Sequence, residues 1–89
     1  MKVIKRNGEL EDFEEGKVAR VVHAAGLSEE QAQQLGQNVS QRIKALNAQQ
    51  VTTIQIRDVV IEEMNKIDKY ATDMFIWYQK GKDERQKKT

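Results

Sequence analysis

Basic side chains gather around the first turn that the sequence predicts. Lys5 and Arg6 precede an Asn-Gly pair, and Lys17 follows in the next predicted element. Lysine meets phosphate oxygens as a point charge, and arginine offers a planar fork of donors. Thr53, at a predicted helix start, would add a hydroxyl and free N–H groups, and Glu11 would accept a hydrogen bond from an amine or a ribose hydroxyl. The set suits a nucleotide, but lysines near a turn also serve solubility, and Thr53 also suits a plain helix cap.

Most kinds of active site are excluded by what the chain lacks. It has no cysteine, which removes disulfides and thiolate sites, and its single histidine, His23, cannot build a histidine-rich metal site. Its five glycines are scattered, and none forms a Gly-x-x-x-x-Gly-Lys-Ser/Thr phosphate loop. Paired carboxylates such as Glu62 and Glu63 are adjacent and would splay apart on a helix. We therefore expect a binding protein rather than an enzyme, with neither catalytic residues nor metal ligands.

Length and charge narrow the class of protein further. Eighty-nine residues make one domain around a small core, and a formal net charge of +1 gives no general field for a nucleic-acid backbone. We therefore do not expect direct nucleic-acid binding. From Lys80 to Thr89, however, five basic and two acidic residues make a +3 segment. A solvated helix end is the simpler interpretation of this segment, and a nucleic-acid-associated interaction module is the alternative.

Apolar segments are all short. None approaches the roughly 20 residues that cross a bilayer, and no signal-peptide pattern opens the chain. We therefore expect a cytoplasmic protein without a membrane partner.

The first thirteen residues predict a β-hairpin, because Asn7-Gly8 separates two short runs. A two-residue turn would mix apolar and charged side chains on both faces. A three-residue loop over residues 6–8, with Gly8 left-handed, instead pairs Ile4 with Leu10. The opposite face then carries Val3, Lys5, Glu9 and Glu11. We prefer this second register because it places Ile4 and Leu10 together on one face and the charged side chains on the other. An isolated hairpin is only marginally stable in water, so this one must lie against helices.

The rest of the chain predicts four helices with short connections, hence a mainly α protein: a four-helix bundle capped by the N-terminal β-hairpin. The first helix would end at Gly26, and Ser28 with Gln31 would form a capping box for the second. Thr52 and Thr53 both offer caps for the third, Asp68 would cap the fourth, and residues 47–51 are predicted to be a polar connection. The predicted apolar stripes are Val18, Val21, Val22 and Ala25; Ala32, Leu35, Val39, Ile43 and Leu46; Ile56, Val59, Val60 and Met64; and Ala71, Met74, Phe75 and Tyr78.

Three segments resemble conserved blocks of the ATP-cone domain. The run Val-Ile-Lys-Arg-Asn-Gly-Glu-Leu-Glu-Asp-Phe from Val3 resembles its opening signature, and Lys17-Val18 leads into a helix that ends in Ala-Ala-Gly, as in that family. The segment 51–60, with threonines before Ile-Arg-Asp-Val-Val, is similar to the second block, and the segment 71–80 to the closing one. The similarity spans roughly residues 2–82 in the family's order, with Asn7 in place of the usual aspartate.

The resemblance implies a helical bundle lidded by the hairpin, which binds ATP or dATP, usually with Mg²⁺. It also implies roles for single residues: the base beside Val3, the adenine edge beside Glu11, and the ribose and phosphate side lined by Thr53 and Arg57. Lys5, Lys17 and Lys80, together with Arg6, would hold the phosphates. The complete set of implied nucleotide-binding residues is Val3, Lys5, Arg6, Glu11, Lys17, Thr53, Arg57 and Lys80.

The resemblance also sets expectations for the whole chain. Residues 1–82 would form an ATP-cone-like domain and residues 83–89 a basic C-terminal tail. The domain would act as a nucleotide-sensing regulatory module on a ribonucleotide reductase or on a related nucleotide-metabolism or transcription partner. Its nucleotide occupancy would be reported through a protein partner or through self-association.

Overall fold

The computed structural model describes residues 2–5, 7–47 and 49–87, with side chains described as far as Gly81. The elements in chain order are β1 (Lys2–Ile4), β2 (Leu10–Asp12), α1 (Glu15–Ala24), α2 (Glu29–Ala45), β3 (Gln50–Thr52), α3 (Thr53–Asn65) and α4 (Lys69–Lys87). The predicted mainly α class with four helices and N-terminal strands is confirmed. Most of the predicted basic tail, residues 83–89, belongs to the α4 backbone, but its side chains lie outside the described residues.

The hairpin has the register that segregates its side chains. Val3 lies opposite Glu11, and Ile4 lies opposite Leu10. The Gly8 N–H donates to the Lys5 carbonyl at 2.9 Å, and Gly8 has a φ of +87°, which a residue without a Cβ adopts readily. The predicted three-residue loop with a left-handed glycine is therefore confirmed.

A third strand corrects the prediction of a polar connection over residues 47–51. β3 pairs in parallel with β1, with Val51 opposite Val3 and Thr52 opposite Ile4, so β1 is the central strand of a sheet ordered β2-β1-β3. Val51 and Val3 are both buried, which anchors this small sheet to the helices. The pairing partner of β3 lies far away in the sequence, so no local signal marked the strand.

Helix ends follow the capping predictions. Ser28 and Gln31 form the capping box of α2, and the Asp68 carboxylate accepts from the N–H groups at the start of α4. At the end of α1, the Leu27 N–H donates to Val22 and the Gly26 N–H to His23. These two bonds make a Schellman motif, and Gly26 takes the left-handed position with a φ of +127°.

The core lies between α1, α2 and α3, and the predicted α2 stripe is nearly all inside it. The buried apolar residues are Val3, Val22, Ala25, Leu27, Ala32, Leu35, Val39, Ile43, Val51, Val60, Met64, Ala71 and Phe75. Four stripe members are exposed instead, namely Val21, Leu46, Met74 and Tyr78, and for these the prediction was wrong. Each stands at the edge or end of its stripe, where apolar spacing alone does not reveal whether a neighbouring helix reaches it.

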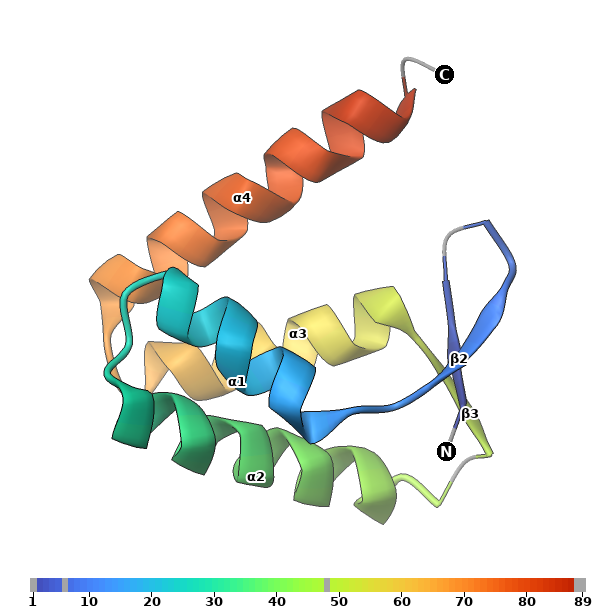
Figure 1. Cartoon of the computed structure of the whole chain (residues 1–89), viewed down its shortest axis with the longest axis horizontal. Helices are drawn as coiled ribbons and strands as arrows, with labels where there is room; N and C mark the ends of the chain where they lie inside the picture. The colour runs from blue at the N-terminus through green and yellow to red at the C-terminus, as the bar shows by residue number, and fades with distance from the viewer. Residues whose placement is uncertain (1, 6, 48, 88–89) are drawn as a thin grey trace.

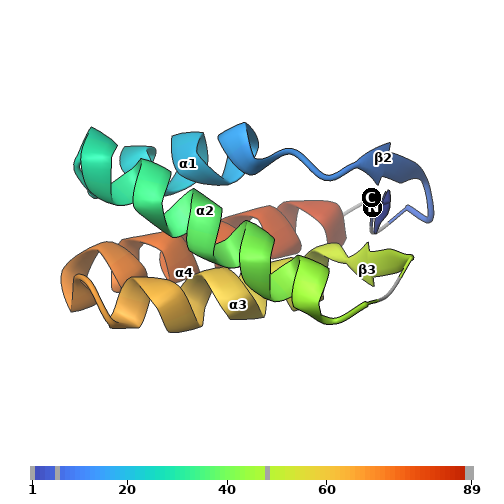
Figure 2. The same cartoon turned by 90° about the horizontal axis from the view of Figure 1, so that it is seen from below.

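The three-dimensional arrangement places the sheet at one end of the helical layer (Figures 1 and 2). α1 packs on α2, α2 on α3, and α3 on α4. α4 begins beside the turn after α1, where the Ala71 side chain lies 3.6 Å from the position that a Cβ on Gly26 would take. It then runs away from α2 (Figure 1), which leaves aromatic residues such as Trp77 exposed.

Candidate functional site

Three charged residues from the hairpin and α1 converge on the inner face of the sheet. One Glu11 oxygen lies 3.7 Å from the Lys5 ammonium, and the other lies 3.6 Å from the Lys17 ammonium. Lys5 and Glu11 share a face of the hairpin because strand residues alternate and Val3 pairs with Glu11. Lys17 arrives from the first turn of α1. The sheet register and the start of α1 thus bring two cations to one carboxylate, an arrangement that can also hold the oxygens of a phosphate.

β3 leads into α3 at the end of the sheet where Lys5 follows β1. Because β1 and β3 run in parallel with Ile4 opposite Thr52, the next residues, Lys5 and Thr53, leave the sheet at the same end. Arg57 follows Thr53 by one helical turn, and its Nε lies 3.9 Å from the Asp58 carboxylate.

The cap of α3 is Thr52, not Thr53. The Thr52 hydroxyl accepts from the Gln55 N–H at 3.1 Å, and the Gln55 side chain accepts from the Thr52 N–H at 2.8 Å. The interpretation of Thr53 as a plain cap is therefore wrong. Its hydroxyl stands in the first turn of the helix, outside the capping box.

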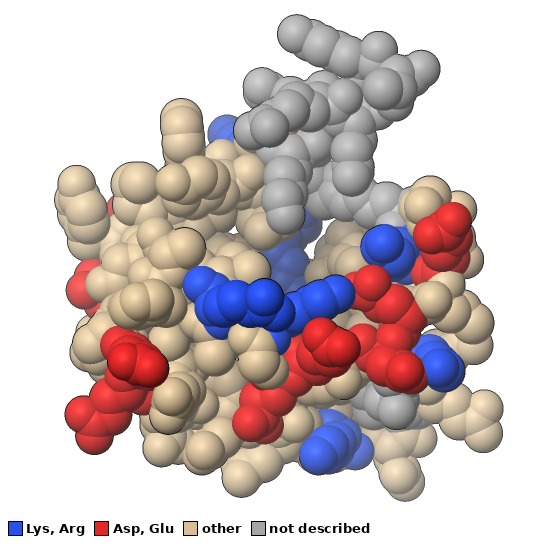
Figure 3. All heavy atoms as spheres, viewed as in Figure 1, with Lys and Arg blue, Asp and Glu red and all other residues tan. Residues whose placement is uncertain are grey.

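The face of the molecule seen in Figure 3 is hollowed beside the hairpin. Lys and Arg side chains line the hollow and its rim, and acidic side chains stand next to them on the hairpin side (Figure 3). On the outer face of the sheet, Lys2 lies 2.6 Å from Asp12, and this hydrogen bond lowers the pKa of the Asp12 carboxyl. The hairpin therefore carries ion pairs on both faces, and among the described residues the pair that it shares with a helix is the inner Glu11–Lys17 pair.

A second ionic cluster joins α2 to α3. Arg42 contacts Glu62 and lies 3.0 Å from the buried Glu63 carboxylate, which Lys66 also contacts at 3.0 Å. Hydrogen bonds from Lys66 and Arg42 lower the pKa of Glu63, against the opposing effect of burial. Hydrogen bonds to Glu62 and then to Glu63 raise the pKa of the Arg42 guanidinium. This cluster links the two helices through ion pairs.

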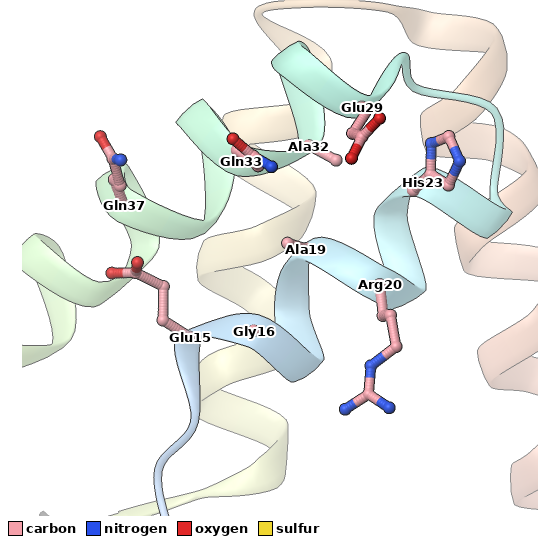
Figure 4. Close-up of a pocket in the computed structure, with 9 residues that line it drawn as sticks. All are labelled: Glu15, Gly16, Ala19, Arg20, His23, Glu29, Ala32, Gln33 and Gln37. Carbon is pink, nitrogen blue, oxygen red and sulfur yellow. The ribbon is translucent and has the colours of Figure 1, made fainter.

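A groove of about 530 Å³ between α1 and α2 was not predicted from the sequence. Small residues let the helices approach, since a Cβ on Gly36 would lie 3.3 Å from the Glu15 carbonyl oxygen. Glu29 and Gln33 line the α2 side, while Arg20 turns away from α2 (Figure 4). The signal that could have revealed this groove is the helical spacing of glycine and alanine in both helices. Neither of the converging lysines lines this groove, which is lined by Arg20 but offers no comparable pair of lysines.

Metal-binding and membrane-spanning features were also sought in the part of the chain that the structure describes. No group of three or more acidic or histidine side chains there could hold a metal ion. No helix there is both long enough and apolar enough to span a bilayer.

Comparison with known protein families matches residues 1–81 to the ATP cone domain. The chain belongs to the ATP cone domain family. Its relatives include the transcriptional repressor NrdR of Enterococcus faecalis, 33% identical over 73 residues, which are 78% of this chain and 46% of the repressor. The NrdR repressor of Chlamydia trachomatis is 28% identical over 88 residues, which are 93% of this chain and 57% of that protein. This ATP cone thus spans about half the length of the repressors that it matches.

The relatives bear on two expectations. They are named as transcriptional repressors rather than as enzymes, in agreement with a regulatory module. A transcriptional repressor acts on genes, so the expectation that this ATP cone does not bind nucleic acid directly finds no support in them.

Two of the implied nucleotide-binding residues form no described ion pair with this cluster, and a third lies outside the described residues. Val3 is only 4% exposed and belongs to the core, on the same face of the hairpin as Lys5. Lys80 is exposed on α4, and the contacts of the described residues do not join it to the cluster. Arg6 lies outside the described residues. The structure thus gathers Lys5, Glu11 and Lys17, while Thr53 and Arg57 lie in the first turns of α3.

Proposed function

We propose that this ATP cone binds ATP or dATP and that the phosphates lie between the hairpin and α1. The single observation that carries the proposal is the convergence of Lys5 and Lys17 on one carboxylate in a member of this family. Two ammonium groups held within reach of one anion can each form a charge-assisted bond with a phosphate oxygen. Thr53 and Arg57 would line the ribose and phosphate side from the start of α3.

Mg²⁺ fits this proposal as a companion of the triphosphate. It prefers phosphate, carboxylate and water oxygens, and it usually keeps several waters when it binds with a nucleotide. The described residues offer no acidic cluster for it. We therefore propose that the phosphates and water hold the ion, with Glu11 the nearest carboxylate of the cluster.

The nucleotide would serve as a regulatory signal. Phosphates that contact the hairpin, α1 and α3 together add contacts that exist only when these elements are closed, and so shift the population toward that arrangement. A coupling of about 1–3 kcal/mol to a partner is typical for such devices. We propose a partner in ribonucleotide reduction or its transcriptional control, or a second copy of the chain. We also propose a cytoplasmic location, because transcriptional control takes place where the genes are.

Removal of the two lysines tests the proposal. We expect Lys5→Ala with Lys17→Ala to abolish ATP and dATP binding in titration calorimetry, because both phosphate contacts are lost. The matched control is Lys2→Ala with Lys44→Ala, which removes the same charge from the outer face of β1 and from α2. Helical circular dichroism should be intact in both double variants. Unchanged ATP affinity in the folded Lys5/Lys17 variant would refute the site.

A second candidate function is favoured by the names of the relatives. Because they are transcriptional repressors, we also consider that the basic segment at the end of α4 takes part in contacts with nucleic acid. This segment carries a charge of +3 from Lys80 to Thr89. Phosphate contacts through lysine and arginine would make binding strongly dependent on salt.

Truncation separates the two functions. Deleting residues 83–89 should leave ATP affinity unchanged if the hairpin cluster is the nucleotide site. DNA binding that is steeply salt-dependent in the full chain and lost on truncation would establish the second function. Equal and weak DNA retention by both chains at physiological salt would dismiss it.

A further inference from the structure

Glu11 stands where a ligand phosphate would have to stand. Its two oxygens face different ammonium groups, at 3.7 Å for Lys5 and 3.6 Å for Lys17. A phosphate that bonds to both lysines approaches the same two ammonium groups. Each ammonium has three N–H donors, but a phosphate held beside the carboxylate would be repelled by it, so the two anions compete for the lysines.

We infer that Glu11 is a built-in anion that competes with the ligand's phosphates for Lys5 and Lys17. The inference rests on the proposed function and deepens it, because it assigns to Glu11 control of affinity rather than contact with the base. Lys5, Glu11 and Lys17 together carry a net charge of +1. Replacing Glu11 by glutamine would leave both ammonium groups without a competing charge and raise the net charge to +2.

The same exchange alters a link between elements. Among the ion pairs described for this chain, Glu11–Lys17 is the one that joins the hairpin to α1. A phosphate that takes over Lys17 breaks this pair and puts a ligand contact in its place. Binding and the hairpin–helix connection are therefore coupled through a single carboxylate.

The strength of the competition is modest, because all three side chains are partly exposed. Their exposed fractions are 44% for Lys5, 35% for Glu11 and 51% for Lys17, and such pairs are weakened by solvent. The repulsion between Glu11 and a polyphosphate adds to the effect and falls with salt. We therefore expect roughly a tenfold change in affinity at low ionic strength.

The test uses inorganic tripolyphosphate, which has no base or sugar and so isolates the phosphate contacts. Calorimetry at low salt should show that Glu11→Gln binds tripolyphosphate about tenfold more tightly than the parent chain. Asp12→Asn is the matched control, because it removes one negative charge from the next residue on the opposite face of β2. Its affinity should stay within about twofold of the parent value. Thermal melts of both variants check that the fold is intact.

The outcomes separate the two proposals. If Glu11→Gln binds tripolyphosphate no more tightly than the parent, or if Asp12→Asn tightens it equally, the competing-anion role is wrong. The nucleotide site itself survives that result if ATP binds the parent chain and the Lys5/Lys17 double variant loses it. If neither the parent nor Glu11→Gln binds ATP or tripolyphosphate, both proposals fail. Parallel titrations with ATP and GTP test the alternative role, in which Glu11 contacts the adenine edge. In that case Glu11→Gln would lose the parent chain's preference for ATP over GTP, and the competing-anion role would be wrong.

Discussion

The helical layer and the sheet of this ATP cone are stabilised in different ways. α1, α2 and α3 bury a continuous set of apolar side chains, with Leu35, Val39 and Ile43 at 0% exposure. The sheet has three strands of three residues each, and two valines anchor its inner face. The inner face also carries the partly exposed ion pairs of Glu11 with Lys5 and Lys17, which add little stability in water. The difference indicates that the helices supply a firm base, whereas the sheet can respond to a ligand at small energetic cost.

Truncation of the helical core should have the largest effect. Leu35→Ala removes a fully buried side chain, and we expect a loss of about 2–5 kcal/mol in the free energy of unfolding because a cavity remains. Urea unfolding followed by circular dichroism measures it. Leu46→Ala is the matched control, since that leucine is 54% exposed, and its loss should be far smaller. Similar losses in both variants would mean that α2 does not bury the face described above.

Neutralising the buried carboxylate between α2 and α3 should have the next largest effect. Glu63 has a lowered pKa in the folded protein, so its ion pairs stabilise the fold above its ordinary pKa of 4.5 and lose that effect as the pH falls further. Glu63→Gln should cost about 1–3 kcal/mol at pH 7, and it should flatten the loss of stability below pH 4.5. Glu9→Gln, in the exposed hairpin loop, should leave the pH profile as it is. If Glu63→Gln loses stability below pH 4.5 as steeply as the parent chain, protonation of Glu63 is not what destabilises the fold in acid.

Weakening the sheet should have the smallest effect on stability and a visible effect on binding. Val51→Ala removes two buried methyl groups and should cost about 1.5 kcal/mol. Because β3 carries Thr53 to the site, we also expect ATP affinity to fall several-fold, while Val21→Ala on the exposed side of α1 leaves affinity unchanged. Hydrogen exchange should quicken in β1 and β3 before the α2 amides respond. Equal quickening in α2 would show that sheet and helices unfold as one unit.

Local chemistry made much of this fold predictable. The Asn7-Gly8 turn, the Ser28–Gln31 capping box and the Asp68 cap each depend on residues within a few positions of one another. The hairpin register could be predicted because it separates the Ile4–Leu10 face from the charged face. The same register brings Lys5 and Glu11 to one face. The predicted register could therefore place two of the three cluster residues by geometry alone.

The features that could not be predicted from the sequence depend on non-local packing. β3 is three residues long and pairs with a strand far away in sequence, so Gln50-Val51-Thr52 showed no alternation long enough to predict it. Met74 and Tyr78 fit the apolar stripe of α4 as well as Phe75 does, but only the contacts of that helix with α3 decide which side chains are covered. The groove between α1 and α2 depends in the same way on how closely two helices approach at Gly36.

The central claim is that the hairpin, the start of α1 and the start of α3 hold one triphosphate together. An NMR titration of the ¹⁵N-labelled protein with ATP and Mg²⁺ tests it most directly. We predict that amide shifts change over residues 3–17 and 51–57 in a single saturable process, with little change over residues 29–45 of α2. Saturable shifts confined to α2 and His23 would place the ligand in the α1–α2 groove and contradict the account.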